Sequence, residues 1–137
     1  MSRTHRLRLV LPRAPHAELL AGAAVEELGL QAGFPRDTLE EVKLAVVEAC
    51  LNALEYGNGD VEVELVAHDD RVEARVIDHG PGFDPRRVER PSLDTKLHAQ
   101  RKRGWGLELM RRLMDLVEVE SRPGSTTVRM VRRRGGG

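Results

Sequence analysis

Residues 44–54, LAVVEACLNAL, decide how this chain folds and what it does, because only two of these residues are polar. Glu48 and Asn52 are four positions apart, a spacing that places both side chains on one face of a helix. Asparagine is a poor helix former, so its place in an apolar helix indicates a task for its amide. The alternative is a solvated stripe shared with Glu41 and Glu55, but such a stripe would favour Lys, Glu or Gln over Asn.

The pair suits phosphoryl chemistry. Mg²⁺ keeps most of its waters and takes only one or two protein oxygens beside those of phosphate, so the Asn52 carbonyl would be enough. A carboxylate one turn away would accept a proton from an attacking hydroxyl or water, which makes Glu48 a candidate base. This pattern predicts a metal ligand and a base side by side.

The segment Asp78-His79-Gly80-Pro81-Gly82 follows an alternating, strand-like stretch. Asp78 therefore ends a strand, where its carboxylate would point into a cleft. A carboxylate only accepts hydrogen bonds, so it suits an exocyclic amino group such as that of adenine. The glycines would let a flat ligand approach the backbone. An ordinary strand-ending turn is the alternative, because this motif alone is weakly specific.

The segment Gly104-Trp105-Gly106-Leu107 precedes an apolar helical pattern. Glycines at a helix start expose N–H groups that bind phosphate, with help from the helix dipole. Lys96 and residues 101–103 add positive charge just before it. The alternative is a flexible hinge. Neither a Walker A loop nor a dinucleotide fingerprint occurs, so an ATP site here would be of another kind.

Composition predicts one domain, residues 1–134, with a flexible tail at 135–137. Hydrophobic residues make up 40% of the chain but aromatic residues only 3%, which predicts a core of Leu, Val and Ala. Lys plus Arg and Asp plus Glu both number 22, so no net charge favours direct nucleic-acid binding. A lone cysteine, Cys50, and the lack of a long apolar stretch predict a cytoplasmic protein that is not bound to a membrane.

Periodicity predicts the order strand, two helices, strand hairpin, long irregular segment, helix and two strands. Helices on one face of a mixed sheet follow from this α+β order. The predicted strands are residues 5–11, 61–67, 72–77, 117–120 and 126–131. The predicted helices are residues 15–28, stopped by Gly29, then 35–56, and 107–114. Residues 84–103 are predicted to be a mobile lid, and Arg132 to Arg134 a frayed basic tail.

Taken in order, these segments resemble the N, G1 and G2 boxes of the Bergerat-fold (GHKL) ATPases. The N box is matched by Glu48 to Asn52 with Ala53 and Tyr56, and the other boxes by residues 78–83 and 103–107. Residues 125–127 stand where the family has Gly-Thr-Thr, with Ser125 in place of the glycine. The resemblance covers nearly the whole chain. It implies a two-layer α/β sandwich with a mainly antiparallel sheet, and a site for ATP and Mg²⁺.

Within that superfamily the chain most resembles bacterial anti-sigma factor serine/threonine kinases. Sensor histidine kinases usually carry Asn where Glu48 stands. The resemblance implies that Glu48 is the catalytic base, that Asn52 ligates Mg²⁺ and that Asp78 reads adenine. It implies nucleotide contacts from Asn52, Tyr56, Asp78, Gly80, Gly82, Phe83, Thr95, Arg103, Gly104, Trp105, Gly106, Leu107 and Thr126.

The expected function is therefore that of a Mg-ATP-dependent serine/threonine protein kinase of the anti-sigma type. By resemblance, its partners are a STAS-domain anti-anti-sigma factor, which it phosphorylates, and a sigma factor, which it sequesters. The alternating first strand would also allow a homodimer. The alternatives are a switch kinase of a STAS scaffold without sigma binding, and a non-catalytic ATP-sensing module. Glu48 favours catalysis over sensing.

Overall fold

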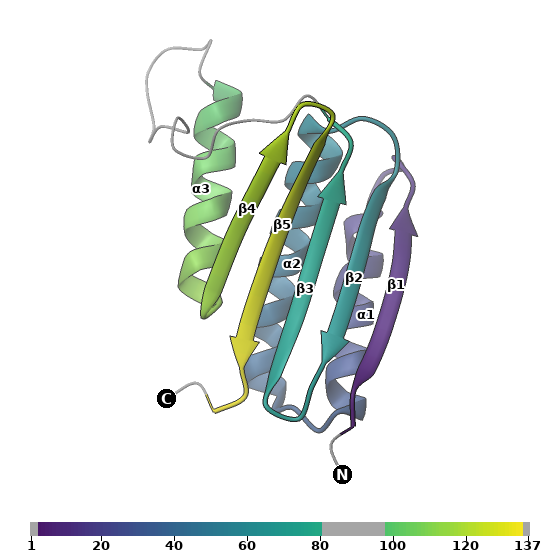
Figure 1. The fold of residues 1–137 in the computed structure, drawn as a ribbon, viewed down its shortest axis with the longest axis vertical. Helices are drawn as coiled ribbons and strands as arrows, with labels where there is room; N and C mark the ends of the chain where they lie inside the picture. Colours follow the sequence, from purple (N-terminus) through teal and green to yellow (C-terminus); the bar gives the residue numbers. More distant parts are fainter. Residues whose placement is uncertain (1–2, 81–97, 136–137) are drawn as a thin grey trace.

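The computed structural model describes residues 3–80 and 98–135, and within helix α3 the side chains from Trp105 onward. Five strands and three helices lie in this part of the chain (Figure 1). In chain order they are β1 (His5–Leu11), α1 (Glu18–Gln31), α2 (Arg36–Tyr56), β2 (Val61–Ala67), β3 (Arg71–Asp78), α3 (His98–Leu113), β4 (Leu116–Arg122) and β5 (Ser125–Arg133).

The described strands form one sheet in the order β1-β2-β3-β5-β4, and each neighbouring pair is antiparallel. The helices pack on one face of this sheet (Figure 1). Strand β2 shows why, because its residues alternate between buried and partly exposed along its whole length. The predicted two-layer α+β fold is confirmed, but among the described strands the sheet is wholly antiparallel and not mixed. The predicted strands 5–11 and 61–67 match β1 and β2 residue for residue.

Aliphatic side chains of α2 and of the inner sheet face fill the core, as the composition predicts. Cys50 lies in this core with no exposed surface. Burial, with the charge of Glu18 as a smaller cause, raises the pKa of the Cys50 thiol to about 12. Cys50 is therefore a protonated packing residue at neutral pH. Among the described residues, no helix combines the length and apolarity that crossing a membrane requires.

The prediction that Gly29 stops α1 is wrong. The helix continues to Gln31, and the chain turns at Gly33, whose φ of 81° is one that glycine adopts freely. A Cβ on Gly29 would lie 2.1 Å from Cδ2 of Leu39 on α2. Gly29 is thus required by the close packing of two helices.

Helix α3 begins at His98, well before the predicted start at residue 107. Residues 98–103 of the predicted lid are therefore helical, and residues 84–97 lie outside the described part of the chain. Between His98 and Gly104 the chain holds Ala, Gln, Arg and Lys, all good helix formers. These residues favour the extension of α3 on the N-terminal side of Gly104.

The prediction of a frayed tail at Arg132 to Arg134 is also wrong. Strand β5 extends to Arg133. The Arg132 guanidinium pairs with Glu41 and donates to the Leu113 carbonyl oxygen at 2.6 Å. Arg134 lies over the Phe34 ring, 4.0 Å from its centre. Arg132 and Arg134 therefore connect the end of β5 to helices α2 and α3 and to the turn after α1.

Candidate functional site

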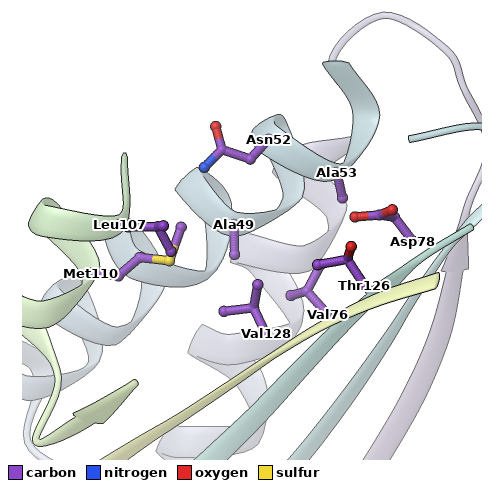
Figure 2. A pocket seen from close by; sticks show the side chains of 9 residues that line it. All are labelled: Ala49, Asn52, Ala53, Val76, Asp78, Leu107, Met110, Thr126 and Val128. Atoms are coloured by element: carbon purple, nitrogen blue, oxygen red, sulfur yellow. The ribbon is translucent and has the colours of Figure 1, made fainter. Parts of the chain in front are cut away.

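A pocket lies between α2, the inner face of β3 and β5, and α3 (Figure 2). Its lining is mostly apolar, with one amide, one carboxylate and one hydroxyl: Ala49, Asn52, Ala53, Val76, Asp78, Leu107, Met110, Thr126 and Val128. The free volume between these side chains is about 10 Å³, roughly what one water molecule needs. Leu107 and Met110 of α3 close one side of the pocket in this conformation (Figure 2).

The sheet side of the pocket is polar. Asp78 ends β3 and is only 6% exposed, and its register partner on β5 is Thr126, which is 2% exposed. The Gly80 N–H donates to Oδ1 of Asp78 at 3.0 Å. Figure 2 shows the Asp78 carboxylate and the Thr126 hydroxyl close together on neighbouring strands. A buried carboxylate beside a hydroxyl offers acceptor and donor sites to the polar edge of a flat ligand.

Ser121 of β4 belongs to this polar side, and the sequence analysis missed it. Its hydroxyl oxygen lies 2.8 Å from that of Thr126, within hydrogen-bond distance. The two residues are register partners across the β4–β5 hairpin. The turn at Pro123-Gly124 was predicted, so counting outward from that turn would have placed Ser121 opposite Thr126.

Glu48 and Asn52 lie together on the side of α2 that faces α3. A Cβ on Gly106 would lie 2.7 Å from Nδ2 of Asn52 and 2.8 Å from Oε1 of Glu48. The amide and the carboxylate therefore reach one point, as their spacing predicts. The side chain of Asn52 also lines the pocket (Figure 2), so the pair continues the pocket away from Asp78.

The prediction that Gly104 and Gly106 open a helix is wrong, because both lie inside α3. Gly106 is buried where α3 meets α2, and Trp105 is 45% exposed. Tyr56 is the last residue of α2. Of the remaining predicted contacts, Gly82, Phe83 and Thr95 lie outside the described residues. For Arg103 and Gly104 the structure describes only the helical backbone.

Residues 11–132 match the histidine kinase-like ATPase domain. The chain therefore belongs to the histidine kinase-like ATPase family, which confirms the resemblance drawn from its motifs. Among curated proteins it is similar to the serine-protein kinase RsbW of Listeria monocytogenes, with 31% identity over 132 residues, 90% of this chain and 84% of that protein. The RsbW of Bacillus subtilis is 30% identical over 129 residues, 88% of this chain and 81% of that protein.

The fold also matches a solved structure, that of the RsbU and RsbW domains of Rv1364c from Mycobacterium tuberculosis. The TM-score is 0.71 at 21% sequence identity. The match covers 94% of this chain and 32% of that longer chain. At this identity the likeness concerns the fold.

Proposed function

We propose that this chain is an ATP-dependent protein serine/threonine kinase of the anti-sigma type. One observation carries the proposal: Glu48 and Asn52 converge on one point beside a pocket that holds a buried carboxylate at its other side. Serine-protein kinases among the similar proteins support it.

The residues present fit adenine. Asp78 would accept a hydrogen bond from the exocyclic amino group, with the Thr126 hydroxyl beside it. Alanine, valine, leucine and methionine side chains would cover the faces of the ring. Because the free volume is only about 10 Å³, Leu107 and Met110 must move before a purine can enter.

The residues also fit Mg²⁺, because a cation that binds mainly phosphate and water needs only one or two protein oxygens, and the Asn52 side chain beside the pocket would supply one. When bound, Mg²⁺ would neutralise charge on the phosphates. The N–H groups near Gly104 and Gly106 would contact phosphate once the start of α3 opens.

Glu48 would then act as the base. As the substrate hydroxyl oxygen bonds to the γ-phosphorus and the bond to ADP breaks, the hydroxyl proton passes to the Glu48 carboxylate. The proposed substrate is a serine or threonine of a STAS-domain anti-anti-sigma factor. A sigma factor would be the second partner, and the edge strand β1 would allow a homodimer.

The experiment measures ATP affinity and phosphate transfer to candidate STAS-domain proteins for the wild type and two variants. Glu48→Gln keeps size and should keep ATP binding, while transfer falls by roughly 10²–10⁴-fold, the usual contribution of a positioned base. Asn52→Ala should weaken ATP binding only when Mg²⁺ is present. Glu40→Gln, an exposed carboxylate on the same helix, is the matched control and should behave as wild type.

Transfer by Glu48→Gln at the wild-type rate would refute the assignment of the base. Tight ATP binding without transfer to any candidate protein would favour the ATP-sensing module instead. Transfer without capture of a sigma factor would favour the switch kinase.

A further inference from the structure

Gly57, the residue directly after α2, does not need to be glycine for its backbone conformation. Its φ is −89° and its ψ is −177°, an extended conformation open to any residue. Gly59, two residues later in the same turn, has a different backbone conformation and more space around it. Its φ is 68°, and a Cβ there would meet no atom within 4 Å. The turn therefore explains Gly59, while Gly57 requires another explanation.

That explanation is the close approach of α2 to the end of β3. A Cβ on Gly57 would lie 2.7 Å from the Ala53 carbonyl oxygen and 2.8 Å from Cβ of Asp78. Across this contact, a Cβ on Gly80 would lie 2.7 Å from Cα of Gly57 and 2.9 Å from the Tyr56 carbonyl oxygen. Both glycines are buried. The Asp78 side chain is thus held between two stretches of backbone.

We infer that Gly57 is a positioning residue that sets the place of the Asp78 carboxylate and thereby the base specificity of the site. This inference rests on the proposed function, in which Asp78 reads adenine. A methyl group at position 57 would clash with its neighbours. The clash cannot be relieved by movement on the helix side, because the Ala53 carbonyl is part of α2. Relief must come from Asp78 or the end of β3. Hydrogen bonds weaken steeply as their geometry departs from the optimum, so a small shift would matter.

The test compares the affinities of ATP and inosine triphosphate, which lacks the exocyclic amino group, by titration calorimetry. Wild type should prefer ATP by roughly tenfold to a hundredfold, because the amino group donates to a carboxylate. Gly57→Ala should bring the ratio to within about threefold, with the loss confined to ATP.

Two glycine variants serve as controls for stability. Gly59→Ala strains the same turn through its positive φ without touching Asp78. Gly29→Ala disturbs helix packing against Leu39, far from the pocket in the chain. Both should lower the melting temperature and leave the ATP to inosine triphosphate ratio at its wild-type value.

The outcomes distinguish the role of Asp78 in adenine recognition from the positioning role of Gly57. Equal binding of both nucleotides by wild type would refute the adenine-reading role of Asp78. A wild type that discriminates, beside a Gly57→Ala variant that discriminates equally, would overturn the inference about Gly57 alone. Equal losses for both nucleotides in Gly57→Ala would also overturn it. So would an unfolded circular dichroism spectrum of that variant, because Gly57 would then be required for the fold itself.

Discussion

Substituting Arg134 tests whether the residue that follows β5 stabilises the domain. Its guanidinium donates to three main-chain carbonyl oxygens, those of Ala32 at 2.8 Å, Gly33 at 2.7 Å and Asp69 at 2.6 Å. Ala32 and Gly33 directly follow α1, so a cation there also complements the helix dipole. The same group lies over the Phe34 ring. Arg134→Ala would remove all of these interactions together.

The expected loss follows from these contacts. A hydrogen bond from a charged donor contributes about 1.5–3 kcal/mol when buried, and we discount this to about 0.7 kcal/mol each because the site is partly exposed. The contact with the ring adds about 0.5 kcal/mol. The sum is about 2.5 kcal/mol, which for a domain of this size lowers the melting temperature by roughly 8–12 °C.

The assay is thermal and urea unfolding followed by circular dichroism. Arg133→Ala is the matched control, since it removes the same charge from the neighbouring residue. Arg133 is exposed, and its contact with Asp115 uses the backbone N–H, which alanine retains. Its loss should stay below about 0.5 kcal/mol. Equal losses for the two variants would refute the view that the Arg134 contacts stabilise the fold.

Three further predictions follow from the pocket and the core. Asp78→Asn replaces an acceptor with a donor beside the adenine amino group and should weaken ATP binding roughly tenfold to a hundredfold in calorimetry; unchanged affinity would contradict it. Cys50, whose thiol pKa is raised to about 12 by burial, should react with a thiol reagent at pH 8 only after unfolding; rapid labelling of the folded chain would show an open core. Gly29→Ala should destabilise the domain by about 1–2 kcal/mol, because overpacking against Leu39 exceeds the gain in helix propensity. The added substitution Leu39→Val should recover part of that loss, and no recovery would place the strain elsewhere.

Local sequence patterns were sufficient to predict the structure wherever the contacts that determine it join residues close together in the chain. The sequences of strands β1 and β2 largely alternate between polar and apolar residues, and the structure gives both the predicted bounds. The four-residue spacing of Glu48 and Asn52 placed both side chains on one face, and both reach Gly106. Helix periodicity and strand alternation depend on neighbours in the chain, which the sequence displays directly.

Two wrong predictions and one missed residue share a cause, which is contact between residues that are not neighbours in the chain. Gly29 resembles a helix stop, but Leu39 on the next helix explains it. Arg134 resembles part of a basic tail, but its partners near Phe34 lie about a hundred positions earlier. Ser121 carries no motif and gains meaning only from its register with Thr126. Propensity and periodicity contain no information about such partners.

Glycines at the site also allow close contacts within the protein that the motifs do not indicate. Gly80, which is predicted to let a ligand approach the backbone, also allows the close approach of Gly57, and Gly106 brings α3 against Asn52. The first contact joins α2 to a strand end in the middle of the sheet, whereas the second joins α2 to the helix that closes the pocket. A purine needs far more than the present 10 Å³, and α3 is the element whose withdrawal would provide it. We therefore expect a nucleotide complex to keep the Gly57–Gly80 contact and to lose the Gly106–Asn52 contact.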